Sequence, residues 1–68
     1  MSVAKVTEIT SSSTQSFEDA VQTGISRADK TLDGIQGAWI KDMKVLVDDG
    51  KVVEYRVDMK VTFLLKGG

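Results

Sequence analysis

The residue types that could carry chemistry in this chain are few. Histidine and cysteine do not occur, which removes imidazole acid–base catalysis, thiolate nucleophiles, the usual zinc sites and disulfides. No serine has a neighbouring general base. A glycine-rich phosphate loop is also missing, because Gly34 and Gly37 follow a predicted helix rather than a strand. We therefore expect a binding protein rather than an enzyme.

One tryptophan and one arginine are the strongest binding candidates. Trp39 can stack on a planar ligand, although packing at an interface is the commoner use of a large aromatic side chain. Arg56 can hold a phosphate or carboxylate through two parallel hydrogen bonds. Its alternative is a cross-strand pair with a carboxylate such as Asp58 or Glu54. Both alternatives stay open for both residues.

The acidic residues predict no complete metal site. Hard cations need several oxygen ligands, and the segment Asp48-Asp49-Gly50 lacks the spacing of an EF-hand loop. The same three residue types favour a hairpin turn. Asp42 belongs to the same group of clustered acids as Asp48 and Asp49. Acids that symmetry brings together from several copies would be a better cation site, whose residues one sequence leaves unknown.

The apolar pattern predicts the elements that must position these residues. We expect strands over residues 3–10, 38–47 and 52–65, and a helix over residues 16–32 whose apolar stripe recurs at helical spacing. Ser16 is a natural N-cap, and Gly34 is placed to end the helix. Gly24 on the buried stripe favours a close approach of helix to sheet. The polar segment 11–16 is expected to be a loop.

The strands predict an α+β fold of order βαββ, with one helix on one face of a three-stranded, antiparallel, twisted sheet. The apolar residues before and after Lys41-Asp42 have opposite parity, which predicts a β-bulge there. Met43, Val45 and Val47 are then expected to share one face. The face without the helix is expected to carry Trp39, Lys41, Lys44, Leu46, Arg56, Asp58, Lys60 and Leu64.

Size and charge limit the class of protein. A chain of 68 residues allows one domain, residues 1–68, and a net charge of −1 argues against nucleic acid as a partner. The sequence has no run of about 18 apolar residues, so we expect no membrane span. We expect a soluble, cytoplasmic protein. A core this small usually needs added stabilisation, and without disulfides self-association is the expected source.

The pattern resembles the dodecin family over nearly the whole chain. The resemblance rests on a Ser/Thr-rich loop before the helix, on element order and length, and on segments 16–21 (SFEDAV), 28–32 (ADKTL) and 55–63 (YRVDMKVTF). It implies a sheet that half-wraps the helix and a hollow homododecamer. Flavin-binding members store or sequester flavins without catalysis, so small-ligand storage is the implied function.

The flavin residues of the family match only in part. Aligned without gaps, the position of the stacking tryptophan is Gly37, and Trp39 lies two residues later. Arg56 replaces a glutamine, which exchanges a donor and acceptor for a pure donor. Lys44 aligns with a basic residue that touches phosphate-bearing ligands in some members. The candidate ligand-binding residues are thus Gly37, Trp39, Lys44 and Arg56.

Two ligand hypotheses follow from this comparison. The sequence more closely resembles calcium dodecins, which lack the stacking tryptophan, so the first is a storage shell that is not a standard flavin binder and associates with cations such as calcium. The alternative is a shell that sequesters riboflavin or FMN. It requires a two-residue shift that brings Trp39 to the place of Gly37, and we expect that shift to reverse the face of the tryptophan. The cofactor, FMN, riboflavin or calcium, is left open.

Overall fold

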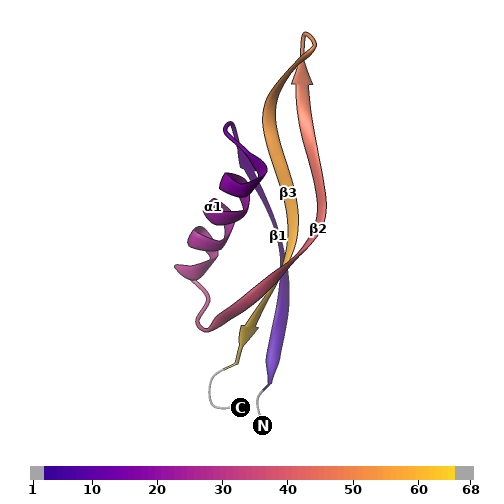
Figure 1. The fold of residues 1–68 in the computed structure, drawn as a ribbon. Helices are drawn as coiled ribbons and strands as arrows, with labels where there is room; N and C mark the ends of the chain where they lie inside the picture. The colour runs from indigo at the N-terminus through magenta and orange to yellow at the C-terminus, as the bar shows by residue number, and fades with distance from the viewer. Residues whose placement is uncertain (1–2, 66–68) are drawn as a thin grey trace.

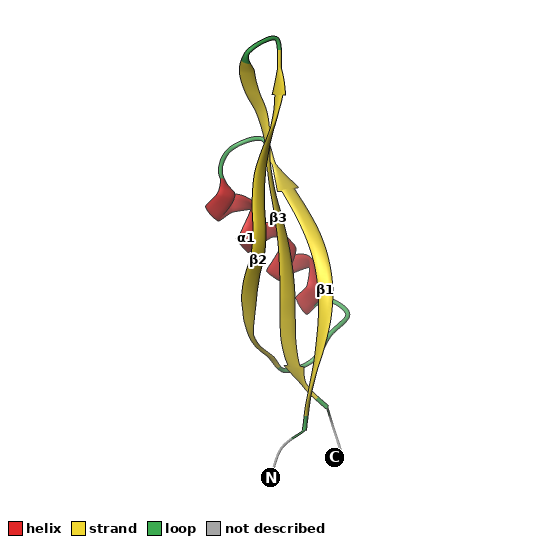
Figure 2. Ribbon diagram, turned by 90° about the vertical axis from the view of Figure 1, so that its right-hand side faces the viewer, coloured by secondary structure: helices red, strands yellow, loops and turns green. Residues whose placement is uncertain are grey.

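A computed structural model describes residues 3–65 and confirms the predicted order βαββ. Its elements are β1 (Ala4–Ser13), α1 (Phe17–Asp29), β2 (Ile35–Asp48) and β3 (Lys51–Leu64). The three strands form one antiparallel sheet in the order β1-β3-β2. Helix α1 packs on β1 and β3 and covers one face of the sheet (Figures 1 and 2). The sheet is long and twisted, and the molecule measures 51 × 19 × 13 Å.

Helix α1 begins as predicted but ends early. The backbone N–H of Asp19 donates to the Ser16 hydroxyl at 2.9 Å, which confirms Ser16 as the N-cap. The helix ends at Asp29, with Lys30 as its C-cap, rather than at residue 32. Gly34 does adopt a positive φ of 68°, but it turns the link into β2 instead of terminating the helix. The expected role of Gly34 as the helix end is therefore wrong.

Strand β1 extends through residues that were expected to form a loop. Ser11 and Ser13 are buried on the helix side, opposite Val57 and Tyr55 of β3. The Ser13 hydroxyl donates to the Asp19 carboxylate at 2.6 Å and accepts from the Gln15 backbone N–H at 2.9 Å. The prediction of a loop fails here because small side chains fit beneath a close helix and because the Ser13 hydroxyl finds partners there.

The core lies where α1 crosses the centre of the sheet. Val57, Met59 and Val61 of β3 are fully buried with Ala20 of α1. This confirms the apolar alternation predicted for the third strand. A β-carbon placed on Gly24 would lie 2.7 Å from Met59 Cε, so the expected close approach of the helix to the sheet is confirmed.

Strand β2 contains the predicted bulge between Ile40 and Asp42 and two further irregularities. One of them lies between Leu46 and Val47, so that Val47 pairs with Val52. From Glu54 to Leu64, residues of β3 with even numbers lie on the face away from the helix. The extra residue at the last irregularity is Val53 of β3, whereas β2 continues without an insertion from Val45 to Val47, so these two valines share a face as expected. The hairpin turn is confirmed by the positive φ angles of Asp49 (52°) and Gly50 (74°). Beyond α1 the β2–β3 hairpin projects as an arm (Figure 1).

Candidate ligand-binding face

One face of the sheet is not covered by the helix, and we call it the open face. The strand register divides it into rows of neighbouring residues, because partners in adjacent strands point the same way. In order toward the hairpin, these rows are Gly37 with Thr62 and Val6, Trp39 with Lys60 and Glu8, Asp42 with Asp58 and Thr10, Lys44 with Arg56 and Ser12, and Leu46 with Glu54.

All the predicted site residues lie on the open face. Gly37 pairs with Thr62, Trp39 with Lys60, and Lys44 with Arg56. The expectation that moving from residue 37 to residue 39 reverses the face is wrong. Side chains alternate with a period of two, so residues two apart in a regular strand point the same way. This removes the geometric objection to Trp39 as a stacking residue.

Trp39 presents a large aromatic surface to solvent. Its exposed fraction is 70%. The ammonium group of Lys60 lies 5.7 Å from the centre of the Trp39 ring, within the range of a cation–π contact. Lys41 from the bulge reaches across the sheet to the Glu8 carboxylate at 3.4 Å. The indole is thus available for stacking, although a cation already lies near one side of it.

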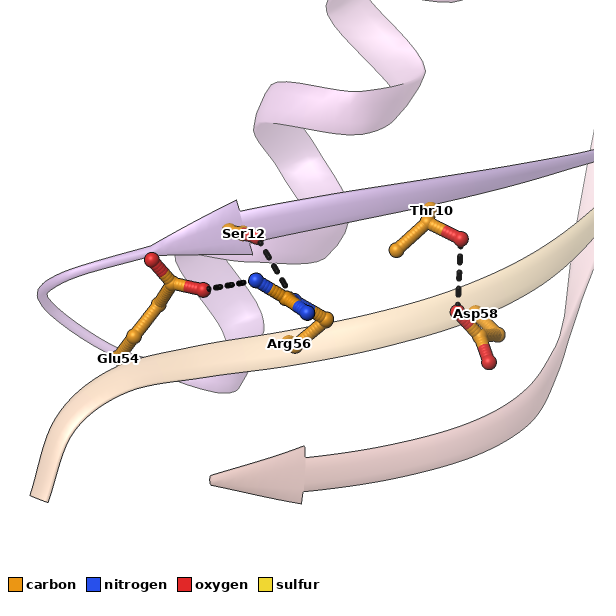
Figure 3. Close-up of polar contacts among 5 residues, drawn as sticks. All are labelled: Thr10, Ser12, Glu54, Arg56 and Asp58. Carbon is orange, nitrogen blue, oxygen red and sulfur yellow. Dashed lines mark hydrogen bonds and ion pairs between the residues drawn. The ribbon is translucent and has the colours of Figure 1, made fainter. Parts of the chain in front are cut away.

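Arg56 is already engaged by its own chain. Its Nη2 lies 2.7 Å from Glu54 Oε2, and its Nε donates to the Ser12 hydroxyl at 3.4 Å (Figure 3). Arg56 does pair with a carboxylate, but Glu54 belongs to the same strand, so the predicted cross-strand pair is wrong. Asp58 instead accepts a hydrogen bond from the Thr10 hydroxyl at 2.8 Å (Figure 3). A ligand anion must therefore compete for Arg56.

Four charged residues surround a small cavity at the centre of the open face. The cavity measures about 120 Å³ and is lined by Asp42, Lys44, Arg56 and Asp58, which we call the charge quartet. Its acids lie opposite each other across β2 and β3, and so do its bases. The cavity is too small for a flavin ring, and the quartet carries two charges of each sign. Sequence reasoning named Asp58 as a possible partner of Arg56 but did not group Asp42 with Lys44, Arg56 and Asp58, because it did not pair the two strands residue by residue.

The described chain does not contain a complete cation site. Within residues 3–65, no cluster of three or more acidic side chains could hold a metal ion. Asp42 and Asp58 supply two carboxylates, whereas calcium takes about six to eight oxygen ligands. Asp49 lies in the hairpin turn and Asp48 at the end of β2, away from the quartet. The donors of one copy therefore do not fit calcium on their own.

A second hollow lies on the other side of the sheet. It is a groove of about 470 Å³ between β1 and α1, lined mainly by small and apolar side chains that include Ile9, Ala28 and Leu32. This groove was not predicted from the sequence. The one sequence feature that indicated it is the row of small residues, Gly24 among them, on the inner stripe of the helix. None of the predicted site residues faces this groove.

The fold and the open face together define a class: small βαββ proteins that leave a polar, aromatic-bearing sheet face uncovered. No helix within residues 3–65 is long and apolar enough to cross a membrane. The chain belongs to the dodecin family, whose profile matches residues 3–66. The resemblance predicted from the sequence is thereby confirmed.

The relatives show the same fold along nearly the whole chain. The calcium dodecin of Mycobacterium tuberculosis is 32% identical over 66 residues, which cover 97% of this chain and 93% of that protein. Dodecin from Streptomyces davaonensis superposes with a TM-score of 0.92 at 29% identity and covers 96% of both chains. A crystal structure of the calcium-chelating M. tuberculosis calcium dodecin gives a TM-score of 0.82 at 31% identity, covering 97% of this chain and 94% of that one.

Proposed function

We propose that this chain, residues 1–68 as one domain, assembles into a homododecameric shell that stores a small ligand or cation and catalyses no reaction on it. One observation carries the proposal. A single helix covers one face of the sheet, and the other face presents Trp39 and a charge quartet without cover. Such a surface in a protein this small requires a partner or a ligand.

We propose further that the protein is not a standard flavin binder. The position that carries the stacking tryptophan in flavin-binding dodecins is Gly37 in this chain, and glycine offers no ring. Arg56 is held by Glu54 at 2.7 Å. Lys60 already lies over the Trp39 ring. The charge quartet is balanced, so the open face attracts a phosphate-bearing ligand less than an isolated pair of bases would.

Cations are the first ligand class. Asp42 and Asp58 lie directly opposite each other, and like charges in such a pair favour a cation between them. A relative with 31% identity is described as calcium-chelating. Because one copy supplies two carboxylates, we propose that a second copy supplies further oxygen ligands.

Flavins are the second ligand class, and a specific observation favours them. Trp39, Lys44 and Arg56 all lie on one face, with the aromatic ring exposed. A planar anionic ligand such as FMN could stack on the indole and place its phosphate near the two bases.

Titration distinguishes the two classes. Riboflavin and FMN are added to the protein at micromolar concentration while flavin fluorescence is followed, and calcium is titrated separately by calorimetry. Strong quenching by protein supports the flavin class and overturns the cation proposal as the main function. Heat of calcium binding without quenching supports the cation class. If neither ligand binds or changes the melting temperature, the shell is a structural assembly and the storage proposal fails.

Native mass spectrometry of protein purified without added ligand completes the test. It reports the number of copies and any bound mass in one measurement. A homododecamer with extra mass supports storage. A monomer of 7.4 kDa at low concentration would overturn the proposed assembly.

A further inference from the structure

The groove between β1 and α1 lies on the helix side of the sheet, away from the storage site proposed for the open face. Its volume of about 470 Å³ falls within the range of about 300–1,000 Å³ that is usual for small-ligand sites. On β1 the lining runs from Thr7 to Ser11, a length of about 14 Å at roughly 3.4 Å per residue. The groove therefore suits an elongated ligand with an apolar body.

Small residues create the groove. Gly24 and Ala28 are buried one turn apart on the inner stripe of α1, and Ser11 lies beneath them on β1. Side chains of this size do not fill the space between the helix and the strand. Because β1 is an edge strand, no further strand of the described chain closes the groove on its outer side.

A buried hydroxyl group without a partner lines this groove. Ser11 is only 9% exposed, yet within residues 3–65 its hydroxyl forms no hydrogen bond. Ser13 on the same face of β1 is equally buried, but its hydroxyl engages both Asp19 and Gln15. No fully enclosed side-chain oxygen in the described chain lacks a partner, so the Ser11 oxygen keeps access to the groove. Buried polar groups nearly always have a partner, and a polar group of a ligand would supply one here.

One cationic side chain stands at the rim of the groove. Among the described residues that line it, Arg27 is the only charged one. Its guanidinium group has no hydrogen bond or ion pair within residues 3–65. Thr23, one helical turn earlier, lines the groove as well. Long side chains in a helix lean toward its N-terminus, so we expect the guanidinium group to lie toward Thr23 and the Ser11 hydroxyl.

We propose that this groove binds a free fatty carboxylate of medium chain length. The carboxylate accepts hydrogen bonds from the Arg27 guanidinium group and from the Ser11 hydroxyl. The hydrocarbon chain lies along Ile9, Ala28 and Leu32, whose length of groove matches an extended decanoate. A carboxylate suits the polar end because it accepts several hydrogen bonds at once and carries the charge opposite to that of Arg27.

The site is complete within one chain. Each residue that lines it belongs to β1, to α1 or to the turn that follows the helix. The inference therefore does not depend on the storage shell proposed above or on the ligand of the open face.

Calorimetric titration with decanoate, below its critical micelle concentration, tests the proposal. Decanol and decyltrimethylammonium carry the same hydrocarbon chain with a neutral and a cationic head group. Decanoate is expected to bind at least about tenfold more tightly than either, because only decanoate pairs with Arg27.

Two substitutions probe the polar end of the groove. Arg27→Gln is expected to raise the Kd for decanoate at least about tenfold, and Ser11→Ala about threefold or more. Neither change removes a side-chain hydrogen bond or ion pair found within residues 3–65, so both variants are expected to fold, which circular dichroism checks. The control is Lys30→Gln, which removes a positive charge at the end of α1 outside the groove lining and is expected to leave the Kd unchanged.

The single tryptophan reports the place of binding. Trp39 lies on the open face, so decanoate in the groove is expected to leave its fluorescence unchanged. Quenching of Trp39 together with an unchanged Kd in both variants would place decanoate on the open face and overturn the proposal. Equal binding of the three probes, or no binding of decanoate, would overturn it as well.

Sedimentation velocity separates this inference from the proposed shell. If decanoate does not bind but folded Arg27→Gln or Ser11→Ala protein assembles differently from the unmodified protein, a second copy occupies the groove and the proposal is wrong. If the unmodified protein stays monomeric and still binds decanoate with the expected preference, the groove site is supported while the storage shell fails.

Discussion

Gly24 of α1 packs directly against Met59 of β3, and this contact sets the distance between helix and sheet. A β-carbon at position 24 would lie 2.7 Å from Met59 Cε and 2.9 Å from Ser11 Cβ. The end of a methionine side chain can move aside, but Ser11 Cβ is attached to the backbone of β1 and cannot. The helix therefore lies as close to the sheet as a residue without a side chain allows.

Gly24→Ala is expected to destabilise the protein despite the better helix propensity of alanine. The propensity gain is about 1 kcal/mol, and overpacking of a tight core costs about 1–3 kcal/mol. We expect a net loss of up to about 2 kcal/mol in the free energy of unfolding. Urea unfolding at one fixed protein concentration measures it, because assembly makes stability depend on concentration.

The exposed helix residue Thr23 provides the matched control for that substitution. Thr23→Ala is expected to leave stability within about 0.5 kcal/mol of the unmodified protein or to raise it slightly. A Gly24→Ala variant more stable than both would show that the helix can move away from β1.

Ser13→Ala is expected to loosen the junction between β1 and α1. The buried Ser13 hydroxyl donates to the Asp19 carboxylate at 2.6 Å and accepts from the backbone of Gln15 at 2.9 Å. Its removal leaves both groups without this partner, at an expected cost of about 1–3 kcal/mol. Thermal unfolding followed by circular dichroism checks the value, with the exposed Thr14→Ala as control. Equal melting temperatures for the two variants would contradict a role for Ser13 in stability.

Sequence periodicity predicted the fold well where one face of an element is fully buried. The unbroken alternation around Val57, Met59 and Val61 predicted β3, and the change of parity around Lys41-Asp42 predicted the bulge. It failed at Ser11 and Ser13, because a polar residue type does not imply exposure: both side chains are small enough to fit beneath the helix, and Ser13 finds a partner in Asp19. It did not reveal the irregularity opposite Val47, where Val53 of β3 is an extra residue.

The candidate site was predictable only in its individual residues. Trp39 and Arg56 stand out by residue type, and both were expected on the face where they lie. The grouping of Asp42 with Asp58, and of Lys44 with Arg56, depends on the register between β2 and β3. A bulge of one residue changes that register for every later pair, so the charge quartet emerges only when the bulge is placed.

Gly50→Val is expected to destabilise the β2–β3 hairpin. Gly50 has a φ of 74° in a turn whose other central residue, Asp49, is also at positive φ. A β-branched residue in that conformation costs about 1–3 kcal/mol. Asp49→Gly is the control and is expected to be tolerated, since glycine adopts positive φ without strain. Urea unfolding distinguishes them, and equal midpoints would show that the turn adopts another conformation in solution.

Arg56→Gln combined with Gly37→Trp is expected to raise the affinity for flavin. Within residues 3–65, no atom beyond the two adjacent residues lies within 4 Å of a β-carbon built at Gly37, so the open face can accommodate the new ring. Glutamine at position 56 restores an acceptor beside the donor and ends the ion pair with Glu54. We expect at least about a tenfold lower Kd for riboflavin, equivalent to about 1.4 kcal/mol, measured by quenching of flavin fluorescence. Riboflavin is the right probe, because it carries no phosphate that would respond to the loss of the Arg56 charge.

Arg56→Gln alone serves as the control and is expected to gain less, since it adds no stacking surface. If the double variant keeps the fold and assembly of the unmodified protein yet leaves riboflavin fluorescence unchanged, the assignment of Gly37 and Arg56 to a flavin site is wrong.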